Sequence, residues 1–142
     1  MASRHSQQVP TVLLRHDLPD GSEHIDWMVA QDALGTLPLL TFRLGKRLDQ
    51  ALQGESLPAC RIAEHRPTYL EYQGPISGGR GSVMRLARGT VTNWQRNEKT
   101  DPERWSMEIR WPSAVQQLEV VRQKLDQWMV FCVTISKAGD KT

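Results

Sequence analysis

The stretch TVLLRHDLPDGSEHIDWMVAQ, residues 11–31, decides the fold class of this chain. Two segments, 11–16 and 24–31, are rich in Val, Leu, Ile and other apolar residues, and the sequence LPDGSE lies between them. Pro, Asp, Gly and Ser favour tight turns, whereas β-branched and aromatic residues favour strands. This stretch therefore predicts a β-hairpin.

The rest of the chain repeats this pattern of short apolar segments between turns. The sequences DALG, SGGRG, NEKTDPE and KLDQ separate segments that contain β-branched and aromatic residues. Short strands at this spacing are typical of a sandwich or a barrel. We therefore expect an all-β, mainly antiparallel fold, a small closed or partly open β-barrel of about eight strands with one short helix. The strand candidates are 11–16, 24–31, 37–44, 59–65, 82–89, 89–97, 104–111, 117–123 and 128–136.

Two segments have helical spacing. In KRLDQALQG, residues 46–54, Leu48, Ala51 and Leu52 would share one face and a glycine closes the segment, so this is the predicted short helix. The segment 115–128 also carries apolar residues at helical spacing. Its β-rich surroundings and its adjacent valines suit a strand as well, and a strand is the favoured reading.

The length of the chain, 142 residues, corresponds to one domain. We expect this domain at 11–136, between flexible polar ends at 1–10 and 137–142. No stretch approaches the roughly 20 apolar residues of a membrane-spanning helix. The N-terminal residues contain no apolar run of the kind that a secretory signal needs. These features predict a cytoplasmic monomer that does not associate with a membrane.

The net charge of the chain is small. Eighteen Lys and Arg residues against sixteen Asp and Glu residues give a formal charge of +2. This balance argues against a protein that coats nucleic acid through overall charge, although it leaves room for local basic patches.

Histidines and one aspartate cluster around the first predicted hairpin. His16 closes the first segment, and His24 and Asp26 lie two residues apart, on the same face of the second. Pairing of the two segments would bring His16 opposite or diagonal to His24. Two imidazoles and a carboxylate suit Mn²⁺, Zn²⁺ or Fe²⁺. The alternative is a structural role, in which the histidines cap strand ends and Asp26 holds a turn.

Two further segments carry polar residues of interest. The sequence EHRPTYLEYQG, residues 64–74, places His65 four residues before Tyr69, and a proline stiffens the connection. The glycine-rich sequence SGGRGS, residues 77–82, lacks the ending of a phosphate-binding P-loop, so it predicts a hairpin loop that presents Arg80.

Together these stretches resemble a known family. His16 with HIDWM (24–28), TFRLGK (41–46), EHRPTYLEYQG (64–74) and SGGRGSVMRLARG (77–89) are similar to the motifs of the 3′-phosphoesterase domain of bacterial DNA ligase D and of its small stand-alone relatives. The resemblance runs from about residue 11 to 97, and the segment that begins at Glu64 is its most specific part.

The resemblance implies a β-barrel enzyme for DNA repair that uses a divalent metal, with Mn²⁺ preferred to Zn²⁺. Such an enzyme would hydrolyse 3′-terminal phosphates or ribonucleotides on nucleic-acid ends. A ligase or polymerase partner is expected to act in trans. By position in the motifs, the implied site residues are the metal ligands His16, His24 and Asp26, the catalytic residues His65 and Tyr69, and the phosphate-binding residue Lys46.

The chain departs from the family pattern at two arginines. Met28 stands where the family has an arginine two residues after the metal-binding aspartate, and Leu57 stands where it has another, eight residues before the histidine. Arg61 and Arg80 are the predicted replacements that bind phosphate. The missing charge could also come from Arg15, Arg43 or Arg66. The alternative function is a non-catalytic relative, a binding or accessory module that has lost turnover together with these arginines.

Overall fold

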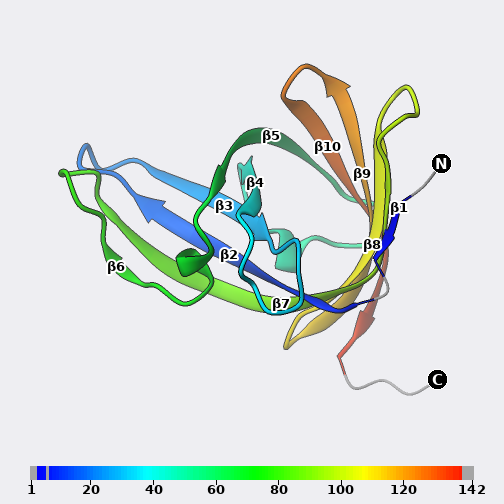
Figure 1. Ribbon diagram of the computed structural model, residues 1–142, viewed down its shortest axis with the longest axis horizontal. Helices are drawn as coiled ribbons and strands as arrows, with labels where there is room; N and C mark the ends of the chain where they lie inside the picture. The colour runs from blue at the N-terminus through cyan, green and yellow to red at the C-terminus, as the bar shows by residue number, and fades with distance from the viewer. Residues whose placement is uncertain (1–2, 6, 139–142) are drawn as a thin grey trace.

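The computed structural model describes residues 3–5 and 7–138, and it consists of one antiparallel sheet that closes on itself (Figure 1). Strand β7 pairs with both β2 and β8, so eight strands form a ring in the order β7, β2, β3, β4, β5, β10, β9, β8. The predicted all-β barrel is therefore confirmed. In chain order the elements are β1 (Ser3–His5), β2 (Val9–Asp17), β3 (Glu23–Val29), β4 (Leu39–Leu44), η1 (Leu48–Gln50), β5 (Ser56–His65), η2 (Pro67–Leu70), β6 (Gly74–Pro75), β7 (Ser82–Asn97), β8 (Arg104–Arg110), β9 (Ala114–Lys124) and β10 (Gln127–Lys137).

The predicted hairpin at the start of the chain is formed by β2 and β3. His16 pairs with His24, and Leu13 pairs with Trp27. The turn between the strands is closed by a backbone hydrogen bond from Leu18 to Ser22 of 2.8 Å. Figure 1 shows this hairpin and the β6–β7 hairpin extending together on the side away from the chain termini.

The predicted helix at 46–54 is wrong. Only Leu48–Gln50 forms a turn of 3₁₀ helix. The buried side-chain amide of Gln116 donates hydrogen bonds to the carbonyl oxygens of Leu48, at 2.8 Å, and of Ala51, at 3.3 Å. These are carbonyls that a longer helix would use for its own bonds, so the tertiary contact limits the segment to one short turn.

The segment 115–128 is strand, not helix. It belongs to β9 and the start of β10, which form a hairpin whose turn includes Leu125 with a φ of 52°. Val120 pairs with Trp105 on one side and with Val130 on the other, so β9 lies inside the sheet. Pairing on both sides outweighs the helical spacing of the apolar residues.

The two predicted strands at 82–89 and 89–97 are one continuous strand, β7. Gly89 marks the point where they were expected to separate. A Cβ atom at this position would lie 2.7 Å from the ring of Trp111. The glycine therefore serves close packing against a tryptophan and not a turn.

The ends of the chain contain more regular structure than the sequence predicts. Strand β1 pairs with β7, and β2 begins at Val9, although 1–10 was expected to be flexible. Strand β10 continues to Lys137, and 139–142 lie outside the described residues. Within 3–5 and 7–138, no helix has the length and apolar character needed to cross a bilayer.

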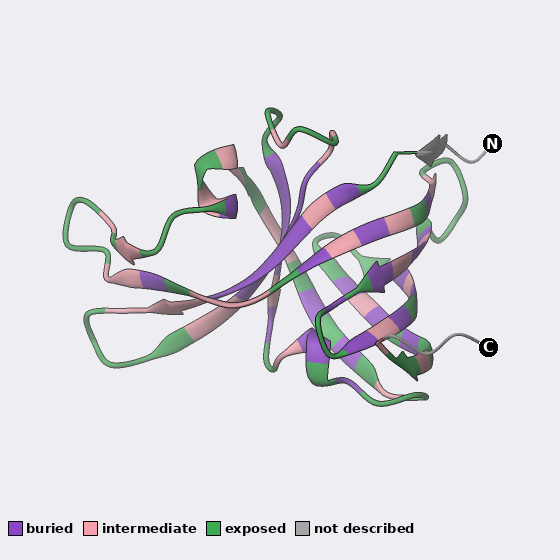
Figure 2. Cartoon of the chain, turned by 90° about the horizontal axis from the view of Figure 1, so that it is seen from below, coloured by how far each residue is buried: buried purple, intermediate pink, exposed green. Residues whose placement is uncertain are grey.

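Aromatic side chains fill the centre of the barrel, where buried residues line the strands (Figure 2). Phe42 contacts three tryptophans, with centroid distances of 5.4 Å to Trp27, 5.6 Å to Trp105 and 5.4 Å to Trp128. Trp94 extends this cluster through Trp105, at 5.8 Å. As the sequence predicts, these tryptophans are core residues.

A register shift in β5 places neighbouring polar residues on opposite faces of the sheet. Phe42 of β4 pairs with Arg61, whereas Leu39 pairs with His65 across an irregularity between Leu39 and Thr41. In a regular strand, residues 61 and 65 would share a face, because side chains alternate with a period of two. The extra residue in β5 reverses this relation. Arg61 therefore faces the aromatic core with Phe42, and His65 faces the other way.

Candidate active site

Most of the polar residues predicted for the site meet in one pocket of about 560 Å³. Strands β2, β3, β5 and β7, the helix η2 and the loop between β6 and β7 all contribute to its walls. We call it the histidine pocket. Its lining residues are His16, Asp26, Met28, Ala63, Glu64, His65, Arg66, Tyr69, Ile76, Ser77, Arg80 and Val83.

The two histidines of the β2–β3 hairpin lie side by side. Their ring centroids are 6.1 Å apart in an edge-to-face arrangement. The Nε2–H of His16 donates to the carbonyl oxygen of Arg80 at 2.7 Å, and this hydrogen bond joins the ends of the two hairpins. The Nδ1 atom of His24 is buried and has no hydrogen-bond partner among the described residues. His24 does not itself line the histidine pocket.

Asp26 is held by an ion pair. Its side chain is 4% exposed, and its carboxylate accepts a hydrogen bond from the Nε of Arg43 at 3.2 Å. The register explains this contact, because Asp26 and Arg43 are direct partners across β3 and β4. The carboxylate is therefore neutralised by a cation of its own sheet.

The fit of a divalent ion at this place depends on Asp26. In the described part of the chain, no three His, Cys, Asp or Glu side chains lie close enough to hold a metal ion. The donor types of His16, His24 and Asp26 match Mn²⁺ and Zn²⁺, and the unpartnered Nδ1 of His24 is a nitrogen that an ion could take up. These residues match the ion by donor type only, because in this structure they do not gather into a metal site and Asp26 is paired with Arg43.

His65 and Tyr69 form a second polar pair in the histidine pocket. Their ring centroids are 5.7 Å apart. The Nδ1–H of His65 donates to the carbonyl oxygen of Ala63 at 2.9 Å, so Nε2 is the nitrogen that remains available for a ligand. Tyr69 is positioned by η2, which has Pro67 in its first turn, where proline suits a helix.

Two arginines bring positive charge to the histidine pocket. The Nε of Arg80 donates to the carbonyl oxygen of Ser77 at 2.8 Å, so the loop itself orients this guanidinium. Arg66 also lines the pocket, and its side chain has no hydrogen-bond or ion-pair partner in the residues that the structure describes. The sequence predicts Arg66 as one of several possible replacements for the missing arginines, and its place next to His65 in the most specific motif supports this role.

Two predicted phosphate-binding residues lie elsewhere. Lys46 forms an ion pair with Glu55 and does not line the pocket. The hydrogen bond from Lys46 is the main reason why the pKa of Glu55 lies below its ordinary value. Arg61 lies over the rings of Trp105 and Trp128 on the other face of β5. The structure therefore brings Arg80 to the histidine pocket but neither Lys46 nor Arg61.

Met28 lines the histidine pocket together with Asp26, as strand alternation predicts. Its side chain is buried, with the whole residue 2% exposed. A thioether cannot form charge-assisted hydrogen bonds to phosphate, so this wall contributes apolar contact where the resembling family would carry a guanidinium.

No protein-family model matches this sequence, and no curated protein matches it. The resemblance to the ligase D phosphoesterase domain thus rests on the sequence motifs alone.

Proposed function

We propose that this protein is a phosphoesterase-like protein that acts on phosphate esters at the 3′ ends of nucleic acids. One observation carries the proposal: His16, the neighbouring residues His65 and Tyr69, and Arg80, which come from three separate parts of the chain, line one pocket. The family resemblance gives His16 a role in metal binding and gives His65 and Tyr69 catalytic roles, and Arg80 is a predicted replacement for a phosphate-binding arginine. An open pocket that combines imidazoles, a phenol and guanidinium groups suits a phosphate ester.

Each side chain of the pocket has a role in this proposal. Arg66 and Arg80 bind the phosphoryl oxygens, because guanidinium groups match their charge and geometry. The hydroxyl of Tyr69 donates a further hydrogen bond to the phosphoryl group. His65 in its protonated form gives the proton on Nε2 to the leaving oxygen, while the carbonyl of Ala63 keeps the ring oriented through Nδ1.

The proposed cofactor is a divalent metal, Mn²⁺ in preference to Zn²⁺. His16, His24 and Asp26 would hold it, and when bound it supplies Lewis-acid chemistry at the phosphoryl group. Arg43 competes for the carboxylate of Asp26, because it forms the existing ion pair at 3.2 Å. A ligase or polymerase that works in trans would use the repaired 3′ end.

The second candidate function is a non-catalytic module that binds nucleic-acid ends. The Asp26–Arg43 ion pair and the buried Met28 favour it, because the first occupies a proposed metal ligand and the second removes a phosphate-binding charge. Arg66 and Arg80 would still bind a phosphate in such a module.

A 3′-phosphorylated DNA primer separates the two functions. The protein is incubated with this primer and Mn²⁺, and released phosphate and bound primer are measured for wild type, His65→Gln and Arg80→Gln, with Arg110→Gln as a control on the exposed part of β8. Phosphoesterase activity predicts phosphate release that His65→Gln abolishes and Arg110→Gln leaves unchanged. Binding that depends on Arg80 without any phosphate release supports the non-catalytic module. If the protein neither releases phosphate nor binds the primer in an Arg80-dependent manner, both functions are refuted.

A further inference from the structure

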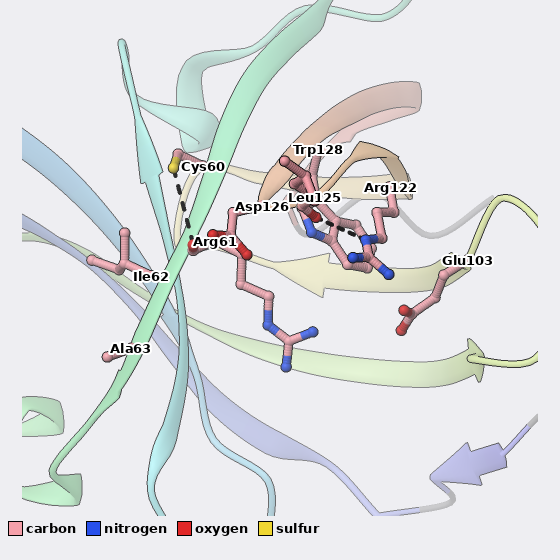
Figure 3. A pocket seen from close by; sticks show the side chains of 9 residues that line it. All are labelled: Cys60, Arg61, Ile62, Ala63, Glu103, Arg122, Leu125, Asp126 and Trp128. Atoms are coloured by element: carbon pink, nitrogen blue, oxygen red, sulfur yellow. Dashed lines mark hydrogen bonds between the residues drawn. The ribbon is translucent and has the colours of Figure 1, made fainter.

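A second pocket, of about 660 Å³, lies on the other side of β5 (Figure 3). We call it the arginine pocket, and the lining residues that matter here are Arg61, Ala63, Glu103, Arg122, Asp126 and Trp128. Ala63 also lines the histidine pocket, so the two pockets meet at this residue.

Arg61 offers an uncompensated cation to the arginine pocket. Its guanidinium carbon lies 5.3 Å from the ring centroid of Trp105 and 5.8 Å from that of Trp128. In the described part of the chain, the guanidinium has no hydrogen-bond acceptor and no ion-pair partner. Figure 3 shows it projecting into the open space of the pocket. Its N–H groups are therefore available to a ligand with acceptor oxygens.

Arg96 adds positive charge next to this site. Its guanidinium carbon lies 4.5 Å from the same ring of Trp105, and its side chain is 13% exposed. The Nε atom is buried without a hydrogen-bond partner among the described residues, although Glu98 lies 3.4 Å away. Burial is the main cause that lowers the pKa of Arg96 below its ordinary value, and the charge of Arg61 adds to it. The carboxylates of Glu98, Glu103 and Glu64 oppose this change. Two repelling guanidinium groups on one ring favour an anion between or beside them.

Among the described residues, the acidic residues of the arginine pocket form no ion pair with Arg61. The carboxylate of Glu103 accepts a hydrogen bond from the indole N–H of Trp105 at 2.9 Å. Asp126 is exposed in the turn between β9 and β10. Arg122 uses its Nε to hold the carbonyl oxygen of Leu125 at 2.8 Å, which leaves its terminal nitrogens for a ligand.

We propose that Arg61 and Arg122 bind a second phosphate group, a backbone phosphate of the nucleic-acid strand whose 3′ end occupies the histidine pocket. This inference rests on the proposed function. Four residues of β5 separate Arg61 from His65, which corresponds to about 13 Å, or about four stacked nucleotides. The pairing of β5 with β10 ends at Cys60, which leaves the edge of β5 open at Ala63. A nucleic-acid strand can therefore pass over this edge from one pocket to the other. The substrate class is therefore an oligonucleotide and not a mononucleotide.

The length of the ligand provides the test. Binding to the full chain is measured for a 3′-phosphorylated single-stranded octanucleotide, for a nucleoside 3′-monophosphate and for inorganic phosphate, each at several salt concentrations. The variant Arg61→Met keeps an unbranched apolar stem against the tryptophans and removes the charge. Arg61→Lys restores a charge, and Arg110→Met is the control for the loss of an exposed arginine. Thermal unfolding verifies that each variant is folded.

We expect Arg61→Met to weaken octanucleotide binding about tenfold, to reduce its salt dependence by about one phosphate contact and to leave the monophosphate unaffected. Arg61→Lys should recover part of this loss. If folded Arg61→Met binds the octanucleotide as tightly as wild type does, the proposal is wrong. It is also wrong if the variant weakens the monophosphate equally, or if inorganic phosphate alone binds in an Arg61-dependent manner as tightly as the octanucleotide.

The outcomes also separate this inference from the proposed function. If 3′-phosphorylated ligands are hydrolysed at rates that do not depend on their length, the proposed phosphate site at Arg61 and Arg122 is wrong and the phosphoesterase function stands. Octanucleotide binding that depends on both Arg61 and Arg80, without any hydrolysis, overturns the phosphoesterase and keeps the inference.

Discussion

The two pockets on either side of β5 differ in how their polar groups are paired. In the histidine pocket, Asp26 is paired with Arg43, and both His65 and Arg80 are oriented by carbonyl oxygens of nearby residues. In the arginine pocket, Arg61 rests on tryptophan rings without any acceptor among the described residues. The first pocket is therefore organised by hydrogen bonds and an ion pair, and the second by the packing of the core. Substitutions should affect the two pockets in different ways.

The largest expected effect is the loss of the aromatic floor of the arginine pocket. Trp105 is fully buried and contacts Phe42, Trp94 and Trp128. Trp105→Ala should lower the free energy of unfolding by about 3–5 kcal/mol, because it leaves a large cavity in the core. Tyr69→Ala, in the wall of the histidine pocket, should cost about 1 kcal/mol, because Tyr69 is only partly buried. Urea denaturation measures both values, and similar costs would show that the two pockets do not differ in this way.

The next effect breaks the histidine pocket without touching the core. A Cβ atom at Gly81, which has a φ of 89°, would lie 1.9 Å from the carbonyl oxygen of Asp17. Gly81→Ala should therefore displace the loop that carries Arg80 and cost about 2–4 kcal/mol in unfolding free energy. Gly21 has the same φ of 89° but no atom within 4 Å of such a Cβ, so Gly21→Ala is the matched control for backbone strain alone. We expect it to cost about 1 kcal/mol.

Binding assays complete this comparison. In folded Gly81→Ala, the nucleoside 3′-monophosphate should bind more weakly than in Gly21→Ala, because Arg80 no longer has its orientation. Equal destabilisation by the two alanines would mean that the loop moves away from Asp17 at no cost, and that it does not fix the position of Arg80.

A third substitution removes the ion-pair partner of Asp26 in the histidine pocket. The pocket would then contain an unpaired charged group, as the arginine pocket does with Arg61. Arg43→Met leaves the carboxylate of Asp26, which is 4% exposed, without its ion-pair partner. Stability in metal-free buffer should fall by about 1–3 kcal/mol, because a buried charge loses its partner while Arg43 itself is partly exposed. Mn²⁺ affinity, measured by calorimetry, should rise about tenfold, because Asp26 no longer has to exchange a cation.

The control for the metal effect is Asp26→Asn in the Arg43→Met background, which removes the carboxylate charge. This double variant should bind Mn²⁺ no better than wild type. An unchanged Mn²⁺ affinity in Arg43→Met would remove Asp26 from the set of metal ligands.

The sequence predicts the local part of this molecule well. The hairpin of β2 and β3 follows from its turn residues and alternating side chains, and the pairing of His16 with His24 follows from counting residues across that turn. The position of Met28 beside Asp26 follows from the same alternation. Each of these relations is set by neighbouring residues.

Relations that depend on the register between distant segments could not be predicted. Nothing within β3 indicates that Arg43 of β4 lies opposite Asp26. The extra residue in β5 separates Arg61 from His65, and a sequence without aligned relatives carries no signal of such a bulge. The helix expected at 46–54 fails for the same kind of reason, because the side chain of Gln116, far along the chain, takes its carbonyl oxygens.

The smallest expected effect concerns the loop between β3 and β4, in which Gly35 lies close to the side chain of Leu70 in η2. The carboxylate of Asp32 accepts hydrogen bonds from the backbone N–H of Thr36 at 2.9 Å and of Leu37 at 3.2 Å, and also from the hydroxyl of Thr36. The Thr36 hydroxyl is the main cause that lowers the pKa of Asp32 below its ordinary value. A depressed carboxyl pKa means that the folded loop favours the ionised form. Its contribution is complete above the ordinary pKa of an aspartate and is lost as the pH falls through the lower folded value.

Asp32→Ala should therefore speed amide exchange of Thr36 and Leu37 by roughly tenfold at most at neutral pH, with the rest of the sheet unaffected. Wild-type protein should show the same local loosening, relative to its β-sheet amides, only in acid, below the ordinary aspartate pKa. Hydrogen exchange measured by NMR tests both statements. The distinction between the pockets predicts that exchange near Trp105 is unchanged, because the floor of the arginine pocket is held by core packing. Faster exchange there would show that this loop supports both pockets and that they are not organised independently.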